Sequence, residues 1–213
     1  QAISTAIRGH LIPNNEKRRI AVECGGEIVG QEKTMIYGER IRFRRAEKED
    51  LPLFMEWINN PDVTEGLTLY LPMGMWEEEE WFAGLAKRPQ AERPLTVDIP
   101  DGDGWRAIGN VSVFNIDSVA HSAEVGIMLG DKSIWNQGYG TEVMRLLLKH
   151  GFETLNLNRI ELLVYEANIW ATRTYEKVGF IHEGRKRQAL FKNGSYQDIL
   201  IMSILRSEWE RNK

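Results

Sequence analysis

The stretch Trp135-Asn136-Gln137-Gly138-Tyr139-Gly140-Thr141-Glu142 is the most informative part of this 213-residue chain, because it joins a polar turn to an amphipathic helix. Two glycines, Gly138 and Gly140, stand one residue apart at the junction. A glycine-rich turn that opens a helix presents unpaired backbone N–H groups and the positive end of the helix dipole, and both attract phosphate. The stretch therefore predicts a binding site for a phosphorylated ligand.

The residues after this turn predict one strand-helix-strand crossover. An apolar face of helical period runs from Val143 to Phe152 and predicts a helix, and Arg159–Val164 has the composition of a buried strand. A second helix is expected over Trp170–Val178, with Gly179 at its end. Because the strand before the turn and the strand after the helix are joined by a helix, they are expected to run parallel.

The rest of the chain predicts antiparallel strands and flanking helices. Extended segments at 95–99, 106–116 and 122–129 are separated by turn residues, which is typical of a meander. Two further extended runs, 189–192 and 198–205, are joined by Asn193-Gly194, a strong hairpin signal. Nearer the N-terminus, the pattern predicts a strand at 41–46 and helices at 47–58 and 76–86. The expected fold is α+β, a mixed and mainly antiparallel central sheet with flanking helices in a single domain.

Residues 1–38 differ from the rest and are interpreted as an N-terminal extension to a domain over 39–213. Short apolar runs flank Cys24-Gly25-Gly26, a pattern that suggests a hairpin. The segment has two open interpretations, an expression leader or a functional arm. An arm of this kind would add strands to the sheet edge of a second copy, so a homodimer is an open alternative.

Composition excludes several classes of protein. Apolar residues make up 42% of the chain, charged residues 27%, and the net charge is −4, so no nucleic-acid footprint is expected and an amine substrate fits better. Cys24 is the only cysteine, and the four histidines are scattered, so neither a disulfide within the chain nor a metal site is expected. No apolar run approaches the roughly 20 residues of a membrane span. We expect a cytoplasmic protein that binds neither membrane nor nucleic acid.

The order of these elements, the glycine turn and the run Asn168-Ile169-Trp170-Ala171-Thr172-Arg173-Thr174-Tyr175-Glu176-Lys177-Val178-Gly179-Phe180 resemble the GNAT superfamily of N-acetyltransferases over residues 39–208. Ala123-Glu124-Val125-Gly126, Trp135 and the C-terminal run from Asn193 to Trp209 resemble the branch that acetylates the N-termini of ribosomal proteins. Spermidine acetyltransferases are similar in the same places. Where the general family pattern has Gln or Arg three residues before the first glycine, this chain has Trp135, which removes one side chain that would contact a pyrophosphate.

The resemblance implies acetyl-coenzyme A as the phosphorylated ligand. Its pyrophosphate would bind the backbone N–H groups of Gln137, Gly138, Tyr139, Gly140 and Thr141. Its pantetheine arm would lie along Ile127, Met128 and Leu129, in a gap where the strands on either side of the helix splay apart. A bulge at Gly126 would help to aim this strand. Asn168 would contact the pantetheine, cap the following helix, or do both.

Two side chains are the candidates for catalysis, and each has a structural alternative. Glu124 matches the acidic residue that many relatives use as the base for the amine; alternatively, it holds a nearby loop or an ion pair. Tyr175 matches the family tyrosine that protonates the leaving thiolate, and its alternative is core packing. The resemblance also implies that the N–H of Met128 stabilises the oxyanion. No metal is required.

The amine acceptor stays open, with protein or peptide N-termini, polyamines and aminoglycosides as alternatives. The run Glu77 to Glu80 lies on a helix that lines the acceptor site in relatives, so it would attract a cationic acceptor or form a solvated face. A function of another class, a non-catalytic acyl-coenzyme A-binding or interaction module, is disfavoured by the presence of both Glu124 and Tyr175.

Overall fold

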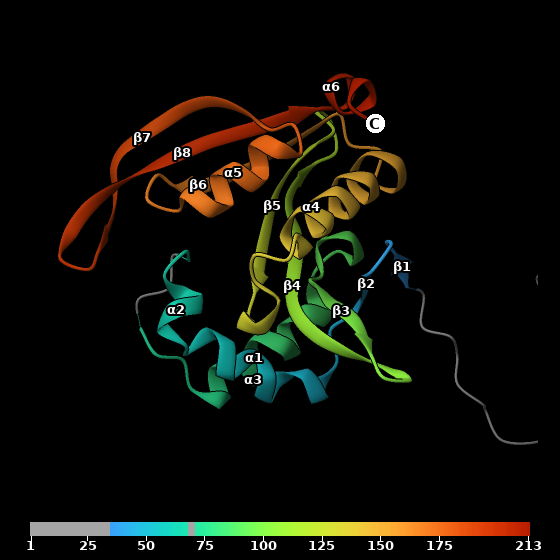
Figure 1. The fold of residues 1–213 in the computed structure, drawn as a ribbon, viewed down its shortest axis with the longest axis vertical. Helices are drawn as coiled ribbons and strands as arrows, with labels where there is room; N and C mark the ends of the chain where they lie inside the picture. The colour runs from blue at the N-terminus through green and yellow to red at the C-terminus, as the bar shows by residue number, and fades with distance from the viewer. Residues whose placement is uncertain (1–34, 68–70) are drawn as a thin grey trace, which may run out of the picture. The chain divides into compact units, whose positions relative to one another are not determined.

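The computed structural model describes residues 35–67 and 71–213, which belong to one compact unit (Figure 1). The hairpin predicted around Cys24 lies outside the described residues. The strands are β1 (Ile36–Tyr37), β2 (Arg42–Arg45), β3 (Leu95–Asp101), β4 (Gly104–Asp117), β5 (Ser122–Leu129), β6 (Arg159–Tyr165), β7 (Ile181–Lys192) and β8 (Ser195–Leu205). The α-helices are α1 (Leu51–Ile58), α2 (Pro61–Thr64), α3 (Met75–Gly84), α4 (Tyr139–Lys149), α5 (Ile169–Lys177) and α6 (Arg206–Arg211).

The described strands form one sheet in the order β1-β2-β3-β4-β5-β6-β8-β7. Every neighbouring pair is antiparallel except β5 and β6, which are parallel. This arrangement confirms the mixed, mainly antiparallel sheet and the single crossover through α4. Since β1 pairs with β2, both residues of β1 belong to the sheet, although the sequence assigned them to the extension.

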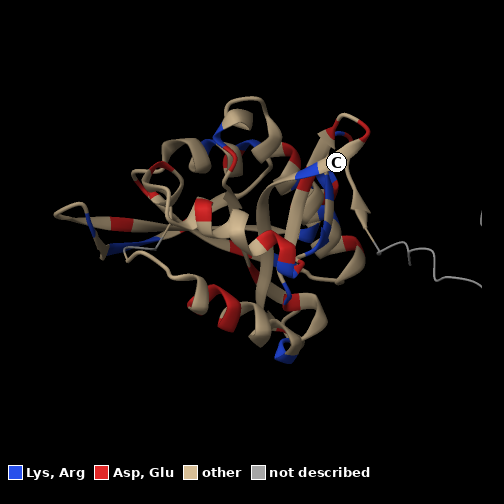
Figure 2. Cartoon of the chain, turned by 90° about the horizontal axis from the view of Figure 1, so that it is seen from below, with Lys and Arg blue, Asp and Glu red and all other residues tan. Residues whose placement is uncertain are grey.

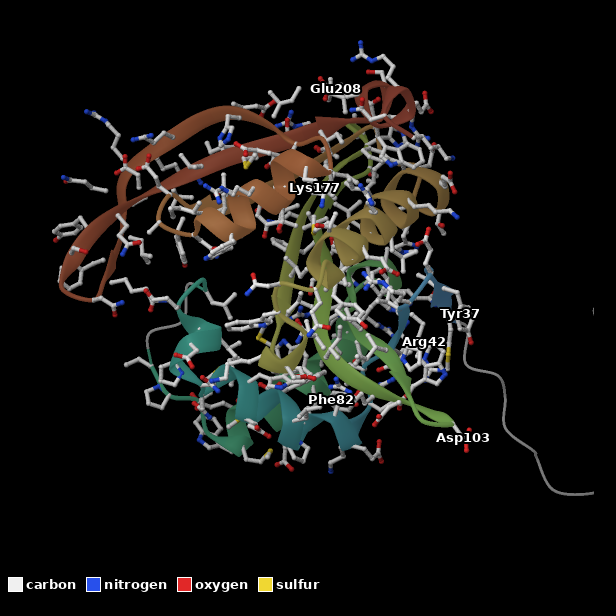
Figure 3. All side chains as sticks on the ribbon, in the orientation of Figure 1. Tyr37, Arg42, Phe82, Asp103, Lys177 and Glu208 are labelled. Carbon is white, nitrogen blue, oxygen red and sulfur yellow. The ribbon has the colours of Figure 1, made fainter. Side chains whose placement is uncertain are left out.

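Two apolar clusters hold helices against the sheet. The main core joins α4 and α5, which lie side by side in Figure 1, to β6 and β8 through fully buried side chains such as Leu147, Ile160 and Met202. A second cluster of Leu51, Phe54, Trp57 and Val63 holds α1 and α2, and Phe82 of α3, labelled in Figure 3, packs against it. Burying such side chains stabilises the fold by about 1.5–3 kcal/mol each.

A charged network fixes the start of α1 to the sheet. The guanidinium of Arg44 donates to both carboxylate oxygens of Asp50 at 2.7 Å, and its Nε donates to Asp98 at 2.9 Å. Arg42 donates from Nε to the same oxygen of Asp98, whose side chain is buried. On its other side Arg42 stacks on Trp105, which also meets Tyr37 edge to face (Figure 3). Both carboxylates in this network accept from an arginine, and the remaining oxygen of Asp98, Oδ1, is buried without a hydrogen-bond partner among the described residues.

The C-terminal hairpin is longer than the sequence predicted. Its turn is as expected, since Asn193 and Gly194 have φ angles of 51° and 76°, the left-handed values that a two-residue hairpin requires. However, β7 begins at Ile181 rather than at Ala189. As the edge strand it is exposed along nearly its whole length, so it lacks the alternation of apolar and polar residues that marks a half-buried strand.

The expected bulge at Gly126 is wrong. The register between β4 and β5 is continuous through Gly126, and the irregularity lies instead in β4, between Phe114 and Asp117. Asn115 has a φ of 53° there, a conformation that asparagine tolerates better than most residues. Gly126 instead leaves room for a ring, because a Cβ on it would lie 3.4 Å from Phe114.

In the cartoon of Figure 2, segments with lysine or arginine lie among segments with acidic residues along the described chain. Among the residues that the structure describes, no helix is long and apolar enough to cross a membrane.

Candidate active site

The sheet opens between β5 and β6. These strands pair only over Ser122–Glu124 and Arg159–Glu161, although β5 continues along β4 to Leu129 and β6 continues along β8 to Tyr165. The backbone edges beyond Glu124 and Glu161 therefore face each other without pairing. This geometry confirms the predicted splay and leaves a gap that an extended chain fits as an additional strand.

The alternation of hydrogen bonds along β5 decides which amides face this gap. Gly130 N donates to Ile108 O at 2.9 Å, so this opposing pair is a hydrogen-bonded one. Because such pairs recur at every second position, the N–H of Met128 points to β4, whereas the backbone groups of Ile127 and Leu129 point into the gap. The N–H of Met128, which the resemblance implied as the oxyanion donor, therefore does not face the gap. Its side chain packs on the second cluster, on the side of α1 and α3.

Trp135 closes one end of the open edge. Its indole Nε1 donates to the carbonyl oxygen of Leu129 at 3.0 Å, so this carbonyl already has a donor from the protein. The tryptophan thus has a structural role at the position where the general family pattern has Gln or Arg. Ile127 and Leu129 also contact the main core through their side chains, on the face opposite Met128.

The glycine turn has the unpaired donors that its sequence predicted. Gly138 has a φ of 84° and caps α4, and the first helical hydrogen bond is from Glu142 N to Gly138 O. Within residues 35–67 and 71–213, none of the amides from Gln137 through Thr141 donates to a protein acceptor. A Cβ on Gly140 would lie 3.5 Å from Leu129 and 3.9 Å from Thr174, so the turn stands where β5, α4 and α5 meet. Five amides at a helix N-terminus form a suitable site for a diphosphate.

Tyr175 and Asn168 come from α5, which faces the same junction. Tyr175 is 8% exposed and packs against Phe180 with ring centroids 5.9 Å apart. Burial raises the pKa of its phenol to about 12. In the described part of the chain its hydroxyl has no hydrogen-bond partner. Asn168 caps α5 by accepting from Ala171 N at 3.1 Å, as predicted, and its amide nitrogen lies against Gly66.

Glu124 stands where β5 and β6 part. Its side chain is on the face opposite the buried Ala123 and Val125, and its Oε1 accepts from the Asn115 amide at 2.8 Å. This contact fits the structural alternative, in which Glu124 holds the β4 bulge. The other oxygen, Oε2, has no partner among the residues that the structure describes. Glu124 therefore lies on the face of the sheet opposite the main core, to which Tyr175 belongs.

A cavity of about 990 Å³ lies between the α1–α2 segment and the end of β7. Its lining is mostly apolar and includes Ile58, Leu71, Met73, Leu190 and Phe191.

Lys192 ties the two walls of this cavity together, a contact that the sequence did not predict. Its ammonium donates to the carbonyl oxygens of Thr64, Glu65 and Leu67 at 2.5, 2.9 and 2.9 Å. Loss of hydration in this position lowers the pKa of the Lys192 ammonium. Asn193 adds a contact by donating to the Glu65 carboxylate at 3.2 Å. The end of the hairpin is thereby fixed to the end of α2.

The acidic run on α3 is divided among three environments. Glu77 accepts from Gly74 N at 2.7 Å and so caps the helix. Glu78 is 4% exposed, and burial raises the pKa of its carboxyl. Glu79 and Glu80 are exposed. The run is therefore not a single patch of four equivalent carboxylates. Among the described residues, no group of His, Cys, Asp and Glu is arranged to hold a metal ion.

Comparisons with known proteins identify the family. The family profile described as Acetyltransferase (GNAT) domain matches residues 40–181. Spermidine N(1)-acetyltransferase of Escherichia coli is 30% identical over 177 residues, which cover 79% of this chain and 88% of that protein. The Bacillus subtilis protein YdaF, whose name assigns it provisionally as a ribosomal N-acetyltransferase, is 34% identical over 105 residues, 49% of this chain and only 57% of that relative.

Solved structures agree with this assignment. Spermidine N-acetyltransferase of Vibrio cholerae, crystallised in complex with CoA and spermine, superposes with a TM-score of 0.72 at 28% identity and covers 80% of this chain and 98% of that one. The fold, the profile match and the relatives agree. The chain belongs to the GNAT family and is an acetyl-CoA-dependent N-acetyltransferase.

Proposed function

We propose that the protein transfers the acetyl group of acetyl-CoA to a primary amine by direct attack within a ternary complex. The observation that carries this proposal is the junction of two features, the open edge of β5 and the unpaired amides of Gln137–Thr141. A pyrophosphate on these amides directs the pantetheine along the edge of β5 into the gap. We call β5, the turn, α4 and α5 the coenzyme side of the site.

The acetyl group is activated by the backbone of β5 in this proposal. The thioester carbonyl accepts a hydrogen bond from the N–H of Ile127, which faces the gap, and this donor stabilises the oxyanion of the tetrahedral intermediate. The C–S bond then breaks, and the coenzyme thiolate takes the proton of the Tyr175 phenol. With its pKa raised to about 12, the phenol holds this proton throughout the neutral and mildly alkaline range.

Glu124 is the proposed base. As the amine forms its bond to the acetyl carbon, it loses a proton to Oε2 of Glu124, directly or through one water, while Asn115 holds the other oxygen. The products are an amide and free coenzyme A. Glu124 releases to solvent the proton that it took from the amine, and the Tyr175 phenolate takes an equivalent proton from solvent, so both residues recover their starting states without net release of a proton.

The acceptor amine reaches the gap from the cavity between α1–α2 and β7, which together with α3 we call the acceptor side. The lining of this cavity is mostly apolar, with Asn59, Thr64 and Asn193 as its neutral polar members. Its two charged side chains already have partners, because the Glu65 carboxylate accepts from Asn193 and the Lys192 ammonium donates to carbonyl groups. A protein or peptide N-terminus with apolar side chains fits such a lining better than a polyamine, which requires several free carboxylates. The polyamine alternative is supported by the relatives named as spermidine acetyltransferases.

The experiment that tests this function is thiol release from acetyl-CoA with a panel of amines: short peptides with free N-termini, spermidine and aminoglycosides. We expect turnover with peptides that begin with small residues followed by apolar ones. Turnover restricted to spermidine would contradict the peptide assignment and leave the acetyl transfer intact. If acetyl-CoA raises Tm but no amine releases thiol, the protein is a non-catalytic acyl-CoA-binding module.

Self-association through residues 1–38 and a cytoplasmic location belong to the same proposal. The measurement for the first is the mass in solution of the full chain and of the chain lacking residues 1–34. An unchanged mass would exclude the extension as the dimer contact.

A further inference from the structure

Arg40 lies beside the glycine turn, although about a hundred residues separate it from the turn in the sequence. Its backbone N and its Nε both donate to the carboxylate of Glu142, at 2.7 and 2.8 Å. Its Nη1 donates to the carbonyl oxygen of Gln137 at 3.3 Å, and its guanidinium carbon lies 4.4 Å from the centre of the Tyr139 ring. Three residues at the start of α4 therefore hold this one arginine.

The guanidinium still has a free face. Its Nη2 lies 3.6 Å from the position that a Cβ on Gly138 would occupy, and it has no acceptor within residues 35–67 and 71–213. The Arg40 side chain is 48% exposed, whereas that of its partner Glu142 is 14% exposed. Of this ion pair, the positive charge of Arg40 therefore faces solvent at the turn more than the negative charge of Glu142 does.

Trp135 supplies the reason why a positive charge is needed from elsewhere in the chain. The indole at that position is directed to Leu129 O, so the side chain three residues before Gly138 brings no charge to the turn. The amides of Gln137–Thr141 and the helix dipole then provide only partial charges for a ligand that carries at least two negative ones. A guanidinium, with several N–H donors in one plane, is well suited to contact phosphate oxygens.

We propose that Arg40 binds the phosphate groups of acetyl-CoA through Nη2. The proposal rests on the placement of the pyrophosphate at the turn. Its rival is a purely structural ion pair that pins the β1–β2 loop to α4.

Removing the two partners one at a time distinguishes these roles. Arg40→Gln and Glu142→Gln break the same ion pair, so a structural pin predicts that both variants lose CoA affinity to a similar degree. A phosphate contact predicts opposite signs. Arg40→Gln loses about tenfold or more in CoA affinity, as expected for a hydrogen bond to a charged group. Glu142→Gln binds CoA as tightly as the parent or more tightly, because a negative charge beside the phosphates has been removed.

Calorimetry with CoA, dephospho-CoA and pantetheine provides the measurement. Arg40→Gln should weaken CoA and leave pantetheine, which has no phosphates, unchanged. A loss that persists with dephospho-CoA assigns the contact to the pyrophosphate, and a loss that disappears assigns it to the 3′-phosphate. Arg187→Gln, an exposed arginine on β7, is the matched control and should bind all three ligands like the parent.

Two results would overturn the proposal: equal losses of CoA affinity in Arg40→Gln and Glu142→Gln, or an equal loss of pantetheine affinity in Arg40→Gln. A different result is expected if the pyrophosphate does not bind at the turn at all. If Gly140→Asp, which adds a negative charge to the turn itself, binds CoA like the parent, the pyrophosphate is not at the turn. If Gly140→Asp loses affinity and Arg40→Gln does not, the placement stands and the role of Arg40 is wrong.

Discussion

The coenzyme side is built mainly from residues that are close together in the sequence, whereas the acceptor side joins segments that are far apart in the sequence. On the coenzyme side the groups proposed to bind the ligand are mainly backbone amides from one continuous stretch, Ile127 to Thr141. On the acceptor side the walls are joined by Lys192, whose partners Thr64, Glu65 and Leu67 are 128, 127 and 125 residues away. A continuous stretch of backbone can keep its geometry while other parts of the chain change, whereas a contact between distant segments changes with either one. We therefore expect substitutions elsewhere in the chain to disturb the acceptor side more than the coenzyme side.

The largest expected effect is on the chemical step at the coenzyme side. Tyr175→Phe should lower kcat by about 10²-fold or more, the usual contribution of a general acid, and leave the Kd of acetyl-CoA unchanged. Since burial raises the pKa of this phenol to about 12, kcat of the parent should show no alkaline loss from Tyr175 below about pH 11. Stopped assays of thiol release with a saturating acceptor measure this. Tyr196→Phe, on the exposed tip of the C-terminal hairpin, is the control. Equal kcat values for the parent and Tyr175→Phe would show that Tyr175 has no catalytic role and serves only in core packing.

The next effect separates binding from stability at the turn. Gly140→Asp places a carboxylate among the proposed phosphate donors, and repulsion at close range should raise the Kd of CoA by about tenfold or more. The same carboxylate in the first turn of α4 interacts favourably with the helix dipole, so Tm of the ligand-free protein should be unchanged or higher. Gly140→Ala is the matched control, because a Cβ at this position makes only ordinary contacts. A fall in both affinity and Tm for Gly140→Asp would indicate a folding defect instead.

A smaller effect is expected when the acceptor side is loosened. Lys192→Met keeps the apolar stem but loses the three hydrogen bonds to the end of α2 and the residues after it, so the KM for the acceptor should rise several-fold while the KM for acetyl-CoA stays unchanged. Initial rates with each substrate varied in turn measure both values. Lys186→Met, on the same strand but exposed, should change neither. A rise in both KM values for Lys192→Met would show that the two sides are not independent.

The same contrast explains what the sequence could reveal. The turn, the crossover and the Asn193-Gly194 hairpin depend on local chemistry, namely left-handed glycines, helical period and turn residues, and all three were predicted. Arg40 and Lys192 contact residues about a hundred or more positions away in the sequence, and no sequence spacing predicts such contacts. The direction of the Met128 amide was not predicted correctly, since it points to β4 and not into the gap, because the direction of an amide depends on the strand register and not on residue type.

The smallest expected effect concerns Glu78. The sequence suggested that the four glutamates of α3 form either a solvated face or an acceptor patch, but Glu78 is buried and fits neither description. Glu78 is 4% exposed as a whole residue, no hydrogen bond to its carboxyl is formed among the described residues, and burial raises the pKa of this carboxyl. A pKa raised in the folded state gives a stabilising contribution that is complete below the unfolded pKa and is lost as pH rises through the folded pKa. Glu78→Gln carries no charge at any pH, so its Tm at pH 7 should exceed that of the parent.

The gain should be a few degrees at most, since 1 kcal/mol corresponds to about 2–4 °C for a chain of this size. It should vanish near pH 4, where the parent carboxyl is itself protonated. Thermal scans between these two pH values measure the difference, and Glu80→Gln, which is exposed, should show none. If the run acts as one acceptor patch, both substitutions should raise the KM for spermidine equally. If only Glu78→Gln raises this KM, the acceptor reaches beneath α3. A lower Tm for Glu78→Gln at pH 7 would contradict the stability prediction, because it would mean that the Glu78 carboxylate makes a stabilising interaction in the folded protein.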